Sequence, residues 1–150
     1  MITYQQEFLE SVRDDAQPLL EAHWQEIALN KDIVPLDPDW DAYERLEEEG
    51  KLFIFTARDG GQLAGYFVVI VAPHIHYKST LFGNNDLIYL APEYRRGFTA
   101  AKLLRFAEQC LRKDGVAVLM INTKDHKPFD ALLTRGGYNL VERVYGKRLE

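Results

Sequence analysis

The sequence predicts one α/β domain of the α+β type, in which a central mixed, mostly antiparallel sheet is flanked by about four helices. Short apolar runs separated by turn residues fill residues 51–90, as in antiparallel strands, whereas residues 100–111 carry apolar side chains at helical spacing. A nearly wholly apolar run at 116–121 is typical of a strand buried on both faces. The 150 residues match the size of one domain, so residues 1–150 are expected to fold together.

Two helices are predicted before the sheet. In residues 16–29 large apolar side chains recur every three or four positions, and Pro18 suits the first turn of a helix. A second helix is expected to begin with Asp37 or Asp39 as its cap and to end at Gly50. The first helix has an apolar face wide enough to pack on a sheet.

Three antiparallel strands are predicted next. Residues 52–57 and 63–71 flank the turn sequence Asp59-Gly60-Gly61-Gln62, which indicates a β-hairpin. A polar turn around residues 76–80 then leads to a third strand, formed by 81–82 and 86–90.

The remaining elements follow Pro92. The helix over 100–111 ends near Gly115, and the buried strand at 116–121 completes a strand–helix–strand crossover. A short helix near 128–134, a turn at Gly136-Gly137 and a last strand over 138–145 are expected at the end of the chain.

Charge is distributed unevenly along the chain. Residues 1–50 hold 14 Asp and Glu against 3 Lys and Arg, whereas residues 51–150 hold 9 against 15. The formal net charge of -5 argues against nonspecific nucleic-acid binding, which needs a broad basic face. No apolar run approaches the length of a membrane span, and the single Cys110 fits a reducing compartment. We therefore expect a cytoplasmic protein with neither a membrane nor a nucleic acid as partner.

The junction between the third strand and the following helix is typical of an anion site. Arg95, Arg96, Gly97 and Thr99 stand where the helix begins, and helix starts present free N–H groups and a positive dipole end. Neither a nucleotide-triphosphate loop nor a dinucleotide fingerprint is present. The junction predicts binding of a phosphate-bearing ligand, while a plain helix entry with solvated arginines is the alternative.

The element order and this junction together resemble the GCN5-related N-acetyltransferase (GNAT) family, whose pyrophosphate loop reads Q/R-x-x-G-x-G/A. Arg95 and Ala100 match the first and last positions, Phe98 stands at the middle glycine position, and Gly97 comes one place early. The run from Pro92 to Glu108 also resembles a subgroup common in bacteriophage and prophage genomes. That resemblance implies the cytoplasm of a bacterium or a phage-infected host.

The resemblance implies that the fourth and fifth strands splay apart and that acetyl-coenzyme A (acetyl-CoA) is the cofactor. Backbone groups of Tyr89 and Leu90 would face pantetheine, and Asn122 would close the other side. The loop and helix start would bind the pyrophosphate through Arg95, Arg96, Gly97, Phe98, Thr99, Ala100 and Ala101.

The expected reaction is N-acetyl transfer to an amine by direct attack in a ternary complex, since Cys110 is expected to be buried and no covalent intermediate is needed. Asp86 is the candidate base, although it also suits a cap of a turn at Asn84-Asn85. Family members often use a tyrosine as the acid, but Leu133 stands at that position. Tyr145 and His126 are therefore the candidate acids.

The acceptor site is expected along the first helix, at Glu21, His23 and Trp24, although Trp24 also suits the core. His74, His76 and Tyr77 are further candidates for substrate binding. His74 and His76 lie two apart on one strand face, but no third ligand accompanies them, so no metal site is predicted.

The acidic first third of the chain favours a cationic acceptor, such as a polyamine, an aminoglycoside-like amine or a protein lysine. The main alternative is a binding module of the same shape that holds acyl-CoA or a protein without turnover. The last strand would also allow a homodimer.

Overall fold

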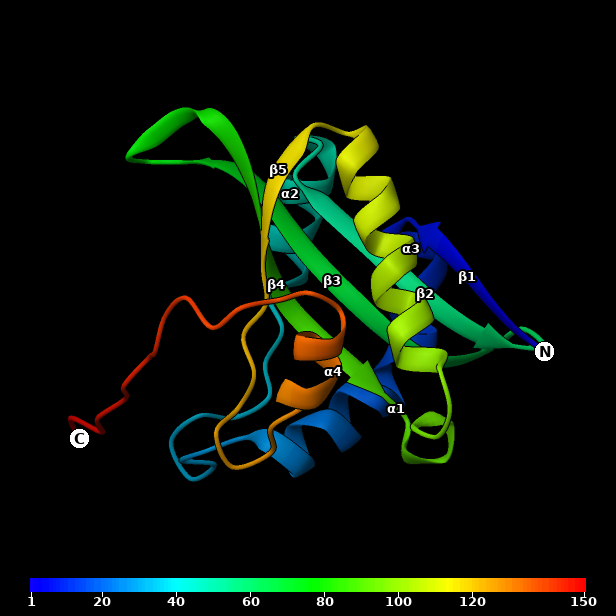
Figure 1. Ribbon diagram of the computed structural model, residues 1–150. Helices are drawn as coiled ribbons and strands as arrows, with labels where there is room; N and C mark the ends of the chain where they lie inside the picture. Colours follow the sequence, from blue (N-terminus) through cyan, green and yellow to red (C-terminus); the bar gives the residue numbers. More distant parts are fainter.

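The computed structural model describes residues 1–150 as a five-stranded sheet with helices on both faces (Figure 1). The strands lie in the order β1-β2-β3-β4-β5 across the sheet. The elements along the chain are β1 (Ile2–Glu7), α1 (Leu9–Ile27), α2 (Trp40–Glu48), β2 (Leu52–Asp59), β3 (Gln62–His74), β4 (Tyr77–Leu90), a 3₁₀ turn η1 (Pro92–Tyr94), α3 (Thr99–Lys113), β5 (Val116–Met120) and α4 (Asp130–Arg135).

Strands β1 to β4 are antiparallel, and β5 joins β4 in parallel, so the predicted mixed sheet is confirmed. Helices α1 and α2 cover one face of the sheet, over a core that includes Leu20, Tyr66 and Val68. Helices α3 and α4 cover the other face, over a core that includes Phe67 and Leu103. The strongly apolar centre of the sheet is buried from both sides because each face carries its own helical layer.

Strand β4 bends and loses its neighbour partway along its length. Its parallel ladder with β5 stops at the pair Asn84 and Met120. Two residues further on, Asp86 is the extra residue of a β-bulge, because Val69 pairs with Asn85 and Val68 with Leu87. A bulge bends a strand and increases its twist. Strand β4 therefore continues to Leu90 with no β5 beside it, as the predicted splay requires.

Gly65 fixes how closely β3 and β4 approach beyond the bulge. A Cβ atom at this position would lie 2.5 Å from the carbonyl oxygen of Tyr89 and 3.0 Å from the Cα of Leu90. No other residue fits without displacing the end of β4.

The N-terminal part of the structure corrects two predictions. Helix α1 begins at Leu9, seven residues before the predicted start, so Pro18 lies inside the helix. Pro18 is exposed, and water can hydrate the carbonyl that its missing N–H leaves free. Strand β1 was not predicted, because it is a short edge strand with mostly polar residues. The second helix is confirmed, and the Asp39 side chain caps it by accepting the N–H of Ala42 at 2.9 Å.

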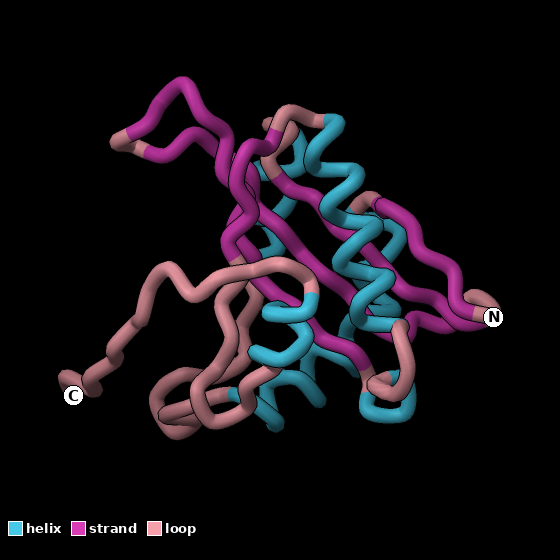
Figure 2. Tube along the Cα trace, in the orientation of Figure 1, coloured by secondary structure: helices cyan, strands magenta, loops and turns pink.

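The hairpin of β3 and β4 is longer than predicted. Its turn falls at Ile75-His76 rather than around residues 76–80, and β4 runs unbroken from Tyr77 to Leu90. The alternative of a turn at Asn84-Asn85 is therefore wrong, since both residues pair within the strand. The tip of the hairpin projects beyond the rest of the sheet (Figure 2).

The strand predicted over 138–145 is wrong, because residues 139–150 carry no regular secondary structure (Figure 2). Apolar and polar residues come in pairs there, as in Leu140-Val141-Glu142-Arg143, and such a pattern presents no single apolar face to a sheet. The prediction that 116–121 is buried on both faces is also wrong. Nothing pairs with the outer edge of β5, and its middle residues are exposed.

A nearly buried ionic network joins β1, α1 and β2. The Arg58 guanidinium donates from Nε to the Glu7 carboxylate at 2.8 Å and from Nη1 to Asp15 at 2.9 Å. The side chains of Glu7 and Arg58 are each only 10% exposed. Burial raises the pKa of Glu7, but hydrogen bonds from Arg58 and Thr56 and the charge of Arg58 outweigh it, so the pKa is lowered.

Replacing Glu7 by Gln should lower the free energy of unfolding at pH 7 by about 3 kcal/mol, because it leaves Arg58 without its nearest counter-charge. The lowered pKa of Glu7 means that its contribution is present above about pH 4.3, the value of an unfolded Glu, and is lost as pH falls through the lower folded value. Urea unfolding between pH 7 and pH 3 measures this. A difference between wild type and Glu7→Gln that stays constant over this range would contradict it.

Candidate active site

One side chain, that of Asn85, connects β4 to the residue after β5 at the point where the two strands separate. Asn85 in β4 accepts the backbone N–H of Asn122 at 2.6 Å and donates from Nδ2 to the carbonyl of Asn122 at 3.4 Å. The predicted cofactor residue Asn122 thus lies just past β5, opposite the bulge. Beyond this clasp, backbone groups of β4 up to Leu90 have no strand beside them on the β5 side.

The chain after β4 ends in an open helix start. Gly97 has a φ of +72°, and nothing lies within 4 Å of the position that a Cβ would occupy there. Phe98 stands at the N-cap position of α3 and makes no side-chain capping bond. The first N–H groups of α3, from Thr99 to Ala101, therefore have no side-chain partner and point toward the junction with a positive dipole end. With the exposed Arg96 beside it, this start suits a pyrophosphate.

Arg95 faces the opposite direction, toward α1. Its guanidinium lies 2.9 Å from the Glu26 carboxylate, donates from Nε to the Leu90 carbonyl at 2.7 Å, and sits 5.3 Å from the centre of the Tyr89 ring. The structure therefore places Arg95 as a link between the loop after β4 and helix α1. Its charge is largely matched by Glu26, which leaves Arg96 as the free cation of the loop.

His23 forms a buried aromatic cluster with two tyrosines on the α1 face of the sheet. Its ring stacks on Tyr89 at 4.8 Å, and its Nδ1 lies 3.1 Å from the hydroxyl of Tyr66. Burial lowers the pKa of His23 to about 4, with the charge of Glu26 opposing that shift and Arg95 adding to it. His23 is therefore neutral near pH 7. Burial also raises the pKa of Tyr66, so that its hydroxyl stays protonated.

Asp86 faces helix α2. It accepts a hydrogen bond from the hydroxyl of Tyr43, whose pKa is raised by burial and by this bond. Asp86 is exposed on the bulge, so a bound molecule can reach its carboxylate. Tyr43 holds that carboxylate in place because the phenol remains a donor at neutral pH.

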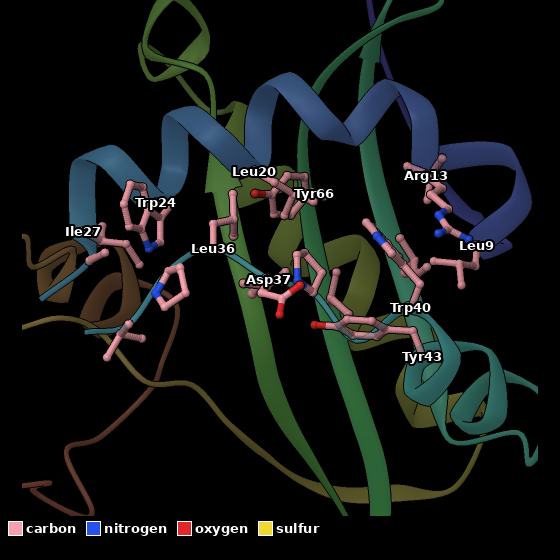
Figure 3. A pocket seen from close by; sticks show the side chains of 18 of the residues that line it. Leu9, Arg13, Leu20, Trp24, Ile27, Leu36, Asp37, Trp40, Tyr43 and Tyr66 are labelled. Carbon is pink, nitrogen blue, oxygen red and sulfur yellow. The ribbon is translucent and has the colours of Figure 1, made fainter. Parts of the chain in front are cut away.

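Next to Asp86 lies a cavity of about 440 Å³ between α1, α2, the segment joining them and the sheet (Figure 3). Its walls are mostly apolar. They include Leu20, Trp24, Ile27, Leu36, Trp40, Tyr43, Tyr66 and Leu87. The predicted acceptor residue Trp24 is one of the residues that line this cavity.

The other predicted site residues lie elsewhere. Tyr145 belongs to the C-terminal segment and is 88% exposed, and His126 is exposed in the loop after β5. Glu21 is an exposed residue of α1 that accepts a hydrogen bond from Gln25.

The hairpin tip holds His74, His76 and Tyr77. The two histidine rings stack at 5.3 Å, and Tyr77 lies 5.1 Å from His74. His74 ends β3 while His76 lies in the turn, so they do not share a strand face as predicted. No group of three or more His, Cys, Asp or Glu side chains is placed to hold a metal ion.

Sequence reasoning missed Tyr43 and Tyr66. Tyr66 lies within an apolar strand and reads as core, which it also is. Tyr43 falls on the same helical face as Trp40, and only the fold brings it to Asp86. The one available signal was that both tyrosines stand on otherwise apolar faces.

The family follows from these features and from comparison with known proteins. A profile of the Acetyltransferase (GNAT) family matches residues 9–132, which covers most of the chain. The chain belongs to this family, and it is therefore an acyltransferase. A comparison with curated protein sequences finds no match.

Solved structures share the fold over the full chain. They include a ribosomal-protein-alanine N-acetyltransferase from Brucella melitensis biovar Abortus 2308, with 19% identity, a TM-score of 0.72 and 100% of both chains covered. An aminoglycoside acetyltransferase from an uncultured soil metagenomic sample has 14% identity and a TM-score of 0.77, with 100% of this chain and 99% of the other covered. A predicted acetyltransferase from Clostridium acetobutylicum, solved with acetyl-CoA, has 11% identity and a TM-score of 0.73, with 99% and 97% covered. At these identities the likeness shows the fold alone. No helix of the structure is both long and apolar enough to cross a membrane.

His23 should remain unprotonated until about pH 4, as followed by NMR of its imidazole signal, which is assigned by its loss in His23→Gln. Because an unfolded His takes up a proton near pH 6.5 and His23 does not, the free energy of unfolding should fall as pH drops from about 6.5 to about 4. His23→Gln should flatten that part of the pH profile. A midpoint near 6.5 for the assigned signal would show that the ring is solvated.

Proposed function

We propose that this protein is an acetyl-CoA-dependent N-acetyltransferase that transfers an acetyl group to an amine by direct attack in a ternary complex. One observation carries the proposal: the carboxylate of Asp86 at the bulge, the part of β4 that β5 leaves unpaired and the open start of α3 follow one another along the chain. That order runs from a proton acceptor to a phosphate site. It suits a long phosphate-bearing donor whose reactive end must meet an amine.

The residues present fit acetyl-CoA. Free N–H groups at Thr99, Ala100 and Ala101, with Gly97 and Arg96, would hold the pyrophosphate. Phe98, exposed beside them, would offer an apolar contact. The backbone of Tyr89 and Leu90 and the clasp at Asn122 would border the pantetheine arm.

When bound, acetyl-CoA would supply an activated acyl group as a thioester. The residues of the protein act first on the amine, which must lose a proton before it can attack. Asp86 would accept that proton at its carboxylate, while the Tyr43 hydroxyl holds the carboxylate toward the cavity. The neutral cluster of His23, Tyr66 and Tyr89 would keep this wall free of competing charge.

A second candidate function is binding of acyl-CoA without turnover. The observation that favours it is that neither candidate acid, Tyr145 or His126, contacts the cleft residues described above. Calorimetry with acetyl-CoA followed by thiol-release assays on a broad amine panel separates the two functions. Binding with thiol release supports the enzyme, and binding without release on every amine supports the module.

Several finer predictions keep the status of proposals. These are the kinship with bacteriophage and prophage proteins, the cytoplasmic location and a protein lysine as acceptor, each of which rests on the sequence. The homodimer was expected from a last strand over 138–145, which the structure does not form.

Arg96→Glu should weaken acetyl-CoA binding about tenfold, because it replaces the free cation of the loop by an anion next to the pyrophosphate site. Lys147→Glu, the same charge reversal in the C-terminal segment, is the matched control and should leave affinity unchanged. Calorimetry gives both dissociation constants. Equal affinities for the two variants would remove Arg96 from the site.

Asp86→Asn should lower kcat at least a hundredfold and leave acetyl-CoA affinity within about twofold, because the amide cannot accept the proton of the amine. Tyr43→Phe should lower kcat about tenfold, since the carboxylate remains but is no longer held. Asp114→Asn, at the exposed end of α3, is the control. An unchanged kcat in Asp86→Asn would discard Asp86 as the base.

A further inference from the structure

The cavity beside Asp86 has the wrong chemistry for a polycation. Among its lining residues Asp37 is the only acid, whereas Arg13 and Lys124 are bases, and most of the others are apolar. A volume of about 440 Å³ lies within the usual range for small-molecule sites. A polyamine would place its charges against apolar walls and two like charges, which costs free energy.

Several acids of the first fifty residues form ion pairs outside the cavity. Asp15 pairs with Arg58, Glu26 with Arg95 and Asp32 with Arg148. Glu44 pairs with Arg13 itself at 3.5 Å. Part of the acidic composition of this region therefore forms ion pairs that connect elements, and Asp37 is its one acid that lines the cavity.

The cavity meets the proposed chemistry at one side. Leu87 and Tyr43 both line it, and Asp86 lies between them: next to Leu87 in β4 and hydrogen-bonded to Tyr43. An occupant can therefore keep its body in the cavity and present one nitrogen at Asp86. The same stretch of β4 is the one that β5 leaves unpaired.

Trp24 lies on the opposite side of the cavity. In Figure 3 Trp24 and Tyr43 lie on different sides of the cavity, with Leu36 and Asp37 between them. The indole Nε1 of Trp24 is buried and has no hydrogen-bond partner, so the indole offers an occupant apolar surface only.

We infer that the acceptor is a monoamine on an aromatic or branched aliphatic skeleton. The skeleton fills the apolar cavity and the amine reaches Asp86. The acetylation of such an amine rests on the proposed function, whereas its binding to the cavity can be measured without any reaction.

The chain supplies its own reporter for binding. Both of its tryptophans, Trp24 and Trp40, line the cavity, so intrinsic fluorescence reports occupancy without any turnover. Phenethylamine should change the fluorescence with an affinity at least tenfold higher than that of spermidine or kanamycin. Spermidine or kanamycin binding as tightly as phenethylamine would overturn the inference.

One variant and a control locate the site. Leu36→Phe adds volume inside the cavity and should weaken phenethylamine binding about tenfold by calorimetry, whereas Leu149→Phe, exposed in the C-terminal segment, should not. Equal effects of Leu36→Phe and Leu149→Phe would contradict the assignment.

Acetyl-CoA binding, measured separately, keeps the two proposals apart. If phenethylamine binds in the cavity but acetyl-CoA does not bind, the proposed function fails and the assignment of the cavity stands. If acetyl-CoA binds and thiol is released with spermidine at a kcat/KM equal to or above that with phenethylamine, the function stands and the assignment fails.

Discussion

The parting of β4 from β5 is the constraint on which the other features depend. A strand pair that continued past Asn84 and Met120 would fill the cleft with its own hydrogen bonds. The bulge at Asp86 turns β4 aside, and the Asn85 side chain satisfies the backbone of Asn122 where the ladder stops. The same bulge that frees the strand edge also presents a carboxylate beside the cavity. Backbone geometry and site chemistry therefore have one origin.

Much of the layout was predictable from periodicity. The alternation around Gly60-Gly61, the change of period after Pro92 and the Asp39 cap each have a local cause, and each appears in the structure. Strand β1 and the C-terminal segment were mispredicted because strands depend on partners remote in sequence. A polar edge such as Ile2–Glu7 becomes a strand by pairing with β2, while residues 138–145 remain irregular without a partner.

Only those parts of the site that depend on local backbone motifs were predictable from the sequence. The helix start at Thr99 follows from residue types at an element boundary, whereas Asp86, expected near the start of a strand, lies at a bulge inside β4. The direction of Arg95, which turns to Glu26, and the pairing of Tyr43 with Asp86 depend on how α1 and α2 lie on the sheet. Net charge was similarly uninformative about the cavity, because most acids on these helices face cations or solvent rather than the interior.

Gly65 in β3 fixes the position of the end of β4, although it lies on the opposite side of β4 from the edge that β5 leaves unpaired. Every side chain larger than hydrogen at this position would collide with the carbonyl of Tyr89 and with Leu90, and the only relief is outward movement of the end of β4. That end is the wall along which the donor would lie. A residue that would touch neither donor nor acceptor therefore acts as a steric spacer that sets where the end of β4 lies.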